Sequence, residues 1–354
     1  MTIDHELITP IMCKDDPLHT CDIVGKGGDR YAFRVNQDTL ISANTKEYIL
    51  AYRKKLFETR GLDVPADHDL SWRKNQEPLW TMDDLADKAT DLYLWVKFDE
   101  LNLSNGDSIT TVTDSGPLAS VLTAGNGITY DANGINSLGV ANMSADDDYF
   151  SIPDAVNLDI NGGRLEMHCV FKTSSDFNST WSGPSDTRFF ADKKDASANI
   201  PRWSWRTEYN NSRGAITEKP SLFRAAGSNN LGKAGSDVNW TDSTTFLVSV
   251  IQVDDTVDHY LNGSANGTPA GNYVHDPDSD GVLYIGNSTA QNASIHGQLA
   301  EIIIIDHSLG SVPAQDAIRE KIEGYLAHKW GLEGNLPADH TYKTDPPRRD
   351  SVYT

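Results

Sequence analysis

The chain has 354 residues, of which 51 are acidic and 30 are basic, giving a formal net charge of -21. This excess of negative charge argues against nucleic acid as the main partner, because phosphate binding requires a basic surface. A hydrophobic content of 38% with 8 Trp, 13 Tyr and 10 Phe is enough for a packed core and argues against disorder. The length predicts two domains, or one large β-sandwich with appendages.

The cysteines predict neither a zinc site nor a disulfide framework. Cys13, Cys21 and Cys169 are odd in number and show no Cys-x-x-Cys spacing. Cys13 and Cys21 could pair with each other, although two free thiols fit a chain in a reducing cytoplasm. Cys169 stands in an apolar stretch and is typical of a small core residue in a strand.

No export signal or membrane span is predicted. Acidic residues appear within the first ten positions, and no apolar stretch approaches the length that crosses a bilayer. We therefore expect synthesis in a cytoplasm without a Sec-type leader, and no membrane partner.

Residues 1–90 predict a partly helical segment that anchors the protein to others. Tyr31 to Asn36 alternates apolar and polar residues and predicts a short strand after a glycine-rich turn. Asn44 and Glu47 have the spacing of a capping box, and a helical stripe follows as far as Gly61.

A short internal similarity links the two ends of the chain. YILAYRKKLFETRGLDVPADH, residues 48–68, resembles GYLAHKWGLEGNLPADH, residues 324–340. Both place a helix before Gly-Leu and then Pro-Ala-Asp-His. A duplicated closing element and chance similarity are both compatible with so short a match.

Residues 91–311 predict an antiparallel sandwich. Short apolar runs are separated by turns every ten or so residues, without the strand–helix alternation that makes parallel sheets. A first strand is expected near Tyr93. The clearest later strands are Tyr149–Ile152, Leu165–Thr173, Arg188–Asp192, Arg202–Tyr209, Phe246–Asp254, His259–Leu261 and Val282–Gly286.

The last part of the chain predicts a core strand, a closing helix and an extended tail. Leu299 to Ile305 is apolar on both faces apart from Glu301, as in a strand buried between two layers. Residues 312–354 follow with an amphipathic helix that Gly331 ends. The apolar stripe of that helix comprises Ala317, Ile318, Ile322, Tyr325, Leu326 and Trp330.

These motifs resemble a known fold family. AEIIIIDHSL, GYLAHKWGL and LPADHTYKTDPP are similar to the C-terminal end of laminin-G-like, concanavalin-A-like jelly rolls of phage and bacterial proteins. LYLWVKF and the Asp-Ser-Gly turn at Asp114 to Gly116 resemble the opening of that family, and DDDYFSIPD, HYLNG and GVLYIGN resemble its later strands. The resemblance implies a jelly-roll β-sandwich over residues 91–347, and the fold hosts lectins, hydrolases and structural modules alike.

The carboxylates do not form a recognisable catalytic set. A retaining glucanase of this fold would hold two carboxylates about 5 Å apart on one sheet face, from Glu-x-Asp-x-Glu on one strand. That triplet is absent, and Glu301 and Asp306 fall on opposite faces of a regular strand. Glu166 stands alone among apolar neighbours. The sequence therefore predicts a protein that is not an enzyme.

A turn before Gly281 carries a possible calcium site. Its acidic residues occupy alternate positions, as at the start of a calcium loop. Asn287 replaces the Glu that would complete such a loop, so a solvated turn is the competing interpretation. The predicted ligands are Asp276, Asp278 and Asp280.

The segment RWSWRTEYNN is the predicted glycan-binding site. Lectin-like sandwiches stack an aromatic ring on a sugar and pair its hydroxyls with Asn, Asp or Arg side chains. Trp203 and Trp205 share one face of a strand, and Arg202 and Arg206 share the other, with Asn210 nearby. The alternative is that both tryptophans pack the core or a subunit contact.

Together these features predict a non-enzymatic structural protein of a phage virion, exposed on the particle surface. A capsid decoration or head-surface protein is favoured over a tail fibre, because heptad and collagen-like repeats are absent. Residues 1–90 and the tail would bind other virion proteins, and a homo-oligomer is expected. The alternatives are a carbohydrate-binding adhesion module and, third, a glycan hydrolase.

Overall fold

The computed structural model describes the chain in segments. They are residues 21–27, 30–35, 79–85, 91–154, 164–177, 187–194, 201–210, 217–226, 229–234, 238, 240–253, 256–267, 281–288, 293–306 and 315–349. The chain divides into two compact units, one of residues 1–80 with 348–354 and one of residues 81–347. The second unit therefore holds the sandwich together with the closing helix and most of the tail.

The first unit contains an antiparallel hairpin. Strands β1 (Cys21–Gly27) and β2 (Arg30–Val35) pair from Cys21 opposite Val35 to Gly27 opposite Arg30. This confirms the strand expected at Tyr31. The predicted helix after Asn44 and the repeat at residues 48–68 lie outside the described residues.

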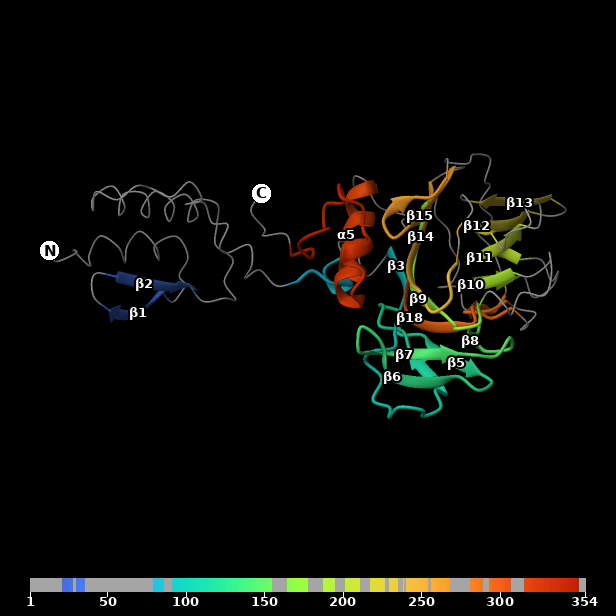
Figure 1. The fold of residues 1–354 in the computed structure, drawn as a ribbon, viewed down its shortest axis with the longest axis horizontal. Coiled ribbons are helices and arrows are strands. Elements are labelled where there is room, and N and C mark those ends of the chain that lie inside the picture. Colours follow the sequence, from blue (N-terminus) through green and yellow to red (C-terminus); the bar gives the residue numbers. More distant parts are fainter. Residues whose placement is uncertain are drawn as a thin grey trace. The chain divides into compact units, whose positions relative to one another are not determined.

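The second unit is built from two antiparallel sheets (Figure 1). Sheet 1 has the order β13-β12-β11-β10-β17-β8-β5-β4, and sheet 2 has the order β16-β15-β14-β9-β18-β7-β6 with β3 also paired to β18. The strands of sheet 1 are β4 (Thr111–Thr113), β5 (Val121–Gly125), β8 (Tyr149–Ile152), β10 (Thr187–Lys194), β11 (Pro201–Asn210), β12 (Thr217–Ala226), β13 (Asn229–Ala234) and β17 (Leu283–Ile285). Those of sheet 2 are β3 (Leu92–Lys97), β6 (Thr129–Ile135), β7 (Leu138–Met143), β9 (Arg164–Thr173), β14 (Thr245–Val253), β15 (Thr256–Leu261), β16 (Ser264–Ala265) and β18 (Gly297–Asp306).

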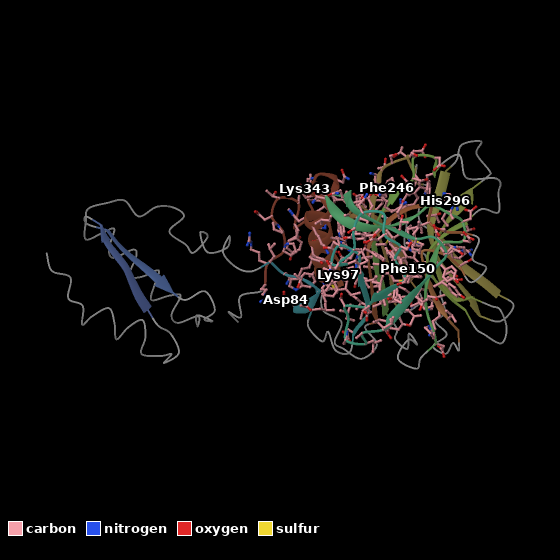
Figure 2. All side chains as sticks on the ribbon, turned by 90° about the horizontal axis from the view of Figure 1, so that it is seen from below. Asp84, Lys97, Phe150, Phe246, His296 and Lys343 are labelled. Carbon is pink, nitrogen blue, oxygen red and sulfur yellow. The ribbon has the colours of Figure 1, made fainter. Side chains whose placement is uncertain are left out.

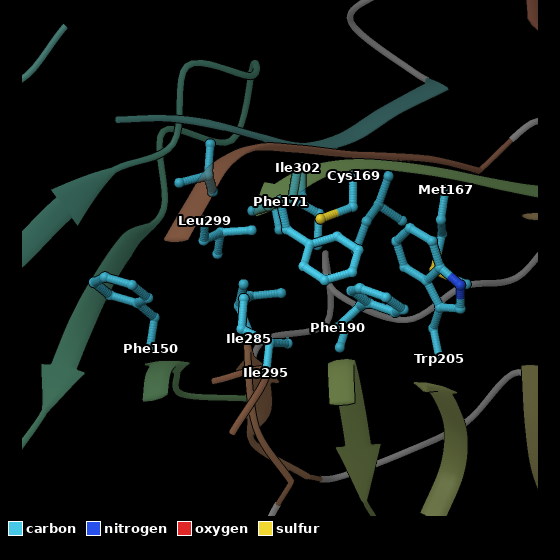
Figure 3. Close-up of a cluster of buried hydrophobic side chains, with 14 of the residues drawn as sticks. Phe150, Met167, Cys169, Phe171, Phe190, Trp205, Ile285, Ile295, Leu299 and Ile302 are labelled. Carbon is cyan, nitrogen blue, oxygen red and sulfur yellow. The ribbon is translucent and has the colours of Figure 1, made fainter. Parts of the chain in front are cut away.

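The core fills the space between the sheets. Strand alternation sends every second side chain inward, so that Met167, Cys169 and Phe171 of β9 meet Phe190 and Trp205 of sheet 1 (Figure 3). Figure 2 shows the described side chains as sticks on the ribbon, with Phe150 and Phe246 of this core labelled. The expectation for Cys169 is confirmed, because its free thiol is fully buried and burial raises its pKa well above the usual value.

Strand β18 is the middle of sheet 2, as its isoleucine run predicts. It pairs with β9 along one edge and with β7 and then β3 along the other. All residues from Leu299 to Asp306 are buried, because the core covers one face and helix α5 the other. The expectation of a strand between two layers is confirmed.

Helix α5 (Gln315–Trp330) closes the outer face of sheet 2, where it contacts β9 and β14 (Figure 1). Ile322, Leu326 and Trp330 of its predicted stripe are buried, whereas Ala317 is exposed. The helix ends at Gly331, whose φ of 70° is a left-handed conformation that favours glycine. Short 3-10 turns, η1 (Met82–Asp84) and η5 (Glu333–Asn335), complete the described elements.

The predicted fold class is confirmed: the protein is mainly β, with two antiparallel sheets and a C-terminal helix. All seven of the clearest predicted strands are present. Strands β12 and β13 were not predicted, because Pro220 interrupts the strand pattern of β12. Pro220 lies opposite Thr207 of β11, and the described pairing of β12 with β13 runs from Ser221 to Ala226.

Candidate functional site

The two predicted tryptophans of β11 face the core. Trp203 and Trp205 expose 4% and 0% of their surface. The Trp205 ring lies 4.8 Å from the ring of Phe190, between centroids, inside the layer between the sheets (Figure 3). The expectation that these rings stack on a sugar is therefore wrong. Their face of β11 points inward, where large aromatic side chains bury most apolar area.

Arg206 lies on the opposite face of β11, directed away from the core. Its guanidinium is 5.7 Å from the ring centroid of Phe189, which lies opposite it on β10. Both side chains are half-buried. The predicted division of β11 into a tryptophan face and an arginine face is thus correct for Arg206. The side chains of Arg202 and Asn210 lie outside the described part of the structure.

Two tyrosines form an aromatic step on the outer face of sheet 1, the face that points away from the core. Phe150 and Ile152 of β8 point into the core, so Tyr149 points outward. A Cβ at Gly125 of β5 would lie 2.1 Å from Cζ of Tyr149, so the ring rests over a backbone that only glycine leaves open. Tyr284 of β17 meets it edge to face, 5.3 Å between ring centroids. Both rings are therefore positioned before any ligand binds.

Polar side chains extend this step into a row across five strands. The register places Thr123 beside Ser151, Ser151 beside Tyr284, Tyr284 beside Asp192, and Asp192 beside Ser204. The Ser204 hydroxyl donates a hydrogen bond to the Asp192 carboxylate. With neighbouring strands about 4.8 Å apart, the row spans about 19 Å. Asp192 and Ser204 are 1% and 0% exposed, whereas Thr123, Ser151 and Tyr284 reach the surface. Rings that pack on apolar ligand faces, next to hydroxyl groups, are the usual parts of a specific polar-ligand site.

The calcium prediction stays untested, because Asp276, Asp278 and Asp280 lie outside the described residues. Within the described segments, no group of three or more His, Cys, Asp or Glu side chains is arranged to hold a metal ion.

Asp146 and Asp148, in the turn between β7 and β8, are held by specific contacts. Asp146 accepts from Arg188 at 2.7 Å and lies 3.1 Å from Nε2 of His296. Asp148 accepts from the backbone N–H of Ala145 at 2.8 Å. Burial, together with the charge of Arg188, lowers the pKa of His296. These contacts fix the turn between β7 and β8.

A serine, a histidine and a glutamate are hydrogen-bonded on the helix side of sheet 2. His168 lies between Ser249, 2.9 Å from its Nδ1, and Glu166, 2.9 Å from its Nε2. This corrects the expectation that Glu166 stands alone. The set has the composition of a hydrolytic triad, but all three residues are 0% exposed. A substrate cannot reach the serine hydroxyl, so the set satisfies buried polar groups.

Glu301 connects the sandwich to its closing helix. The carboxylate is 0% exposed and accepts four hydrogen bonds. Trp95 of β3 donates at 2.6 Å and Tyr325 at 3.0 Å to Oε1, while Lys329 donates at 2.8 Å and Trp330 at 2.9 Å to Oε2. Lys329 also donates to Asp99 at 2.8 Å. We call these six residues the Glu301 cluster.

The ionisable donors of the Glu301 cluster titrate abnormally. Burial and the negative charge of Glu301 raise the pKa of Tyr325 well above its ordinary 10.0. Burial alone would lower the pKa of Lys329, but the charges of Glu301 and Asp99 outweigh it and raise that pKa above 10.5. Both donors therefore stay protonated throughout the neutral range.

Two further motifs of the family resemblance have structural roles beside this cluster. Asp114, from the Asp-Ser-Gly turn, accepts from the backbone N–H of Trp95 at 2.7 Å and from that of Gly116 at 2.8 Å. It occupies the edge of β3 that faces away from β18. His340, from the Pro-Ala-Asp-His motif, packs on Gly263, whose Cβ would lie 3.0 Å from the ring. The tail is thus held on the turn between β15 and β16.

No protein-family model and no curated protein matches the chain. Solved structures with a similar fold include the binding domain of Paraclostridial Mosquitocidal Protein 1, at 9% identity and a TM-score of 0.44, covering 67% of this chain and 53% of that domain. The binding domain of botulinum neurotoxin serotype D is 10% identical with a TM-score of 0.42, covering 64% and 50%. The chain therefore spans about half the length of these two domains.

A third similar structure is domain 4 of AbnA, a GH43 extracellular arabinanase from Geobacillus stearothermophilus, in complex with arabinotriose. It is 15% identical with a TM-score of 0.40, covering 62% of this chain and 94% of that domain. Likenesses this distant carry no argument about function. No helix in the described segments is both long and apolar enough to span a membrane.

Sequence reasoning missed the tyrosine step and the Glu301 cluster. Tyr149 and Tyr284 lie in two of the segments that resemble the family, but their contact depends on β8 and β17 being neighbours in sheet 1. The one local signal was the alternation within β8, in which Tyr149 precedes the core residue Phe150. Glu301 is the single charge in an otherwise apolar stretch, and a buried charge in such a place generally requires hydrogen-bond partners. The identity of those partners was not predictable from the sequence.

Proposed function

We propose that this chain is a non-enzymatic protein whose sandwich binds carbohydrate on the outer face of sheet 1. The observation that carries the proposal is the step formed by Tyr149 and Tyr284, held over Gly125 and continued by the hydroxyl groups of Ser151 and Thr123. Fixed rings cost little ordering entropy on binding, and the adjacent hydroxyl groups match sugar hydroxyls.

The environment of the carboxylates supports a role in binding without cleavage. Glu166 is hydrogen-bonded to His168, and Glu301 accepts four hydrogen bonds in a site closed by α5. Asp192 accepts from Ser204 and is 1% exposed. A glycosidase needs two carboxyl groups that flank one bond of a bound sugar. Within the described residues, these three are engaged elsewhere.

As the setting we propose the surface of a phage virion, as a capsid decoration or head-surface protein. The support is the sequence resemblance to phage and bacterial jelly rolls and the net charge of -21. In this proposal residues 1–90 and the tail bind other virion proteins. A tail-fibre or other adhesion protein is the alternative, and it would use the same face of sheet 1.

The test is incubation of the full chain with a panel of immobilised neutral and acidic polysaccharides. Retention and the release of reducing ends are both scored, with and without a chelator. We expect retention on at least one polysaccharide without release of reducing ends. Release would overturn the non-enzyme proposal, and absence of retention on every polysaccharide would overturn the carbohydrate proposal. Retention that the chelator abolishes would assign binding to the predicted calcium turn.

A further inference from the structure

The Glu301 cluster brings an amine and a carboxylate into contact beside a third, buried ionisable group. Nζ of Lys329 lies 2.8 Å from Oδ1 of Asp99 and 2.8 Å from Oε2 of Glu301. The side chains of Lys329 and Asp99 are 16% and 13% exposed, and that of Glu301 is 0% exposed. Asp99 follows β3, whereas Lys329 is in the last turn of α5, so the contact joins two distant parts of the chain.

Aromatic groups surround this contact and hold its members in place. The ammonium of Lys329 lies 5.1 Å from the ring centroid of Trp330 and 5.8 Å from that of Tyr325. Trp95, Tyr325 and Trp330 all donate to the Glu301 carboxylate, which fixes its orientation. Nζ is thus confined next to the Asp99 carboxyl group in a site with little access to water.

We propose that Lys329 and Asp99 become joined by a spontaneous amide bond, so that α5 is covalently cross-linked to the segment after β3. Lys329 passes one proton to Oε2 of Glu301, and the free amine attacks Cγ of Asp99. One carboxylate oxygen of Asp99 leaves as water, carrying two of the three protons that Nζ bore at the start. Glu301 begins and ends the reaction as a carboxylate. One N–C bond forms, one C–O bond breaks, and no oxidant or reductant is needed.

Confinement of the amine beside the carboxyl group favours this condensation, which is unfavourable between free groups in water. Amide formation between free amines and carboxylates is opposed by the excess of water, but well-oriented intramolecular groups reach effective concentrations of about 10⁵–10⁸ M. The partial exposure of Lys329 and Asp99 gives the released water a way out. The apolar rings around them disfavour the charged pair relative to the neutral one.

The protonation states determine the rate of the reaction. The carboxylates raise the pKa of Lys329, so the charged pair predominates and the reactive neutral pair is a minor form. The two forms hold the same number of protons and differ only in where one proton sits. The rate is therefore independent of pH between the carboxylate and amine titrations, and the bond accumulates slowly after folding.

Intact-mass spectrometry of the reduced, denatured full chain tests the proposal. After prolonged incubation in the folded state, we expect a mass lower than that of the sequence by one water molecule. Proteolysis should release one branched peptide that contains both Asp99 and Lys329. A folded chain that keeps its full mass would overturn the proposal and leave an ion pair. Loss of water without the branched peptide would also overturn it.

Two variants distinguish a loss of cross-linking from a loss of folding. Lys329→Arg keeps a cation beside both carboxylates but lacks a nucleophilic amine, so it should stay folded at full mass. Glu301→Gln cannot take the proton, so in molecules that remain folded the cross-link should form at least tenfold more slowly. An unchanged rate in folded Glu301→Gln would overturn the role given to Glu301.

Discussion

A carboxylate in the middle of an apolar strand costs several kcal/mol of desolvation unless its lone pairs are fully satisfied. Glu301 meets that condition with four donors, of which two are indole N–H groups, one is a phenol and one is an ammonium. The donors come from β3 and α5, so the charge is stable only when strand and helix are both in place. Glu301 therefore couples the two elements more specifically than apolar contact would.

The first prediction concerns this residue. Glu301→Ala removes the shared acceptor of Trp95, Tyr325 and Trp330 and leaves Lys329 with Asp99 alone, so we expect the free energy of unfolding to fall by about 3–5 kcal/mol. Chemical denaturation monitored by tryptophan fluorescence measures the change. Glu100→Ala is the matched control, because Glu100 is 62% exposed and its ion pair is with Lys97 at the surface. A similar loss in both variants would contradict the role of Glu301.

The second prediction concerns alkaline pH. Tyr325 titrates near 10.0 when unfolded and at a higher pH when folded, so its contribution is complete below pH 10 and is lost as pH rises towards the folded pKa. Tyr325→Phe should therefore reduce the slope with which stability falls above pH 10, even if Lys329 is joined to Asp99. Trp330→Phe also removes a donor but carries no titrating group, so it should lower stability without changing the slope. Equal slopes in wild type and Tyr325→Phe would contradict this account.

At the scale of elements, α5 is positioned by Gly324 as well as by its apolar stripe. Gly324 faces the tail, where an added Cβ would lie 2.5 Å from Cβ of Tyr342. His328, one turn further, lies 2.8 Å from the carbonyl oxygen of Tyr342 through its Nε2. The closing helix therefore carries the tail on its outer side, and a glycine in mid-helix is needed for their close approach.

The third prediction concerns Gly324, where intrinsic helix propensity favours alanine and packing favours glycine. In an isolated helix Gly→Ala stabilises by about 1 kcal/mol. Gly324→Ala should instead lower the melting temperature, because the backbone of Tyr342 has to move. Gly334→Ala is the control, since nothing lies within 4 Å of its added Cβ. A raised melting temperature for Gly324→Ala would show that the tail is not packed on α5 as described.

The elements were largely predictable because their signals are local. The alternation in β8, the isoleucine run of β18 and the glycine stop after α5 each act within a few residues, and each is confirmed. Which face of β11 would be buried was not predictable, because that depends on the other sheet. His168 and Glu301 each have one distant partner, Ser249 and Trp95, which lie 81 and 206 residues away, and the fold brings them together.

At the scale of the whole molecule, the two faces of the sandwich unit have different roles. The outer face of sheet 2 is covered by α5 and the tail, which the Glu301 cluster and His340 hold in place. The outer face of sheet 1 carries the row from Thr123 to Ser204 and the tyrosine step. Most of the segments that resemble the jelly-roll family lie in sheet 2, in α5 or in the tail. We propose that carbohydrate binds to the outer face of sheet 1.

The most direct test of this division is the affinity of the full chain for a retained polysaccharide, measured by titration calorimetry with face-specific variants. Tyr284→Ala and Arg206→Ala remove outward side chains, and each should weaken binding about tenfold, equivalent to about 1.4 kcal/mol. Val121→Ser changes a 51% exposed residue of the same sheet away from the tyrosine step and should leave affinity unchanged. Unchanged affinity in Tyr284→Ala and Arg206→Ala would contradict the proposal that this face binds carbohydrate.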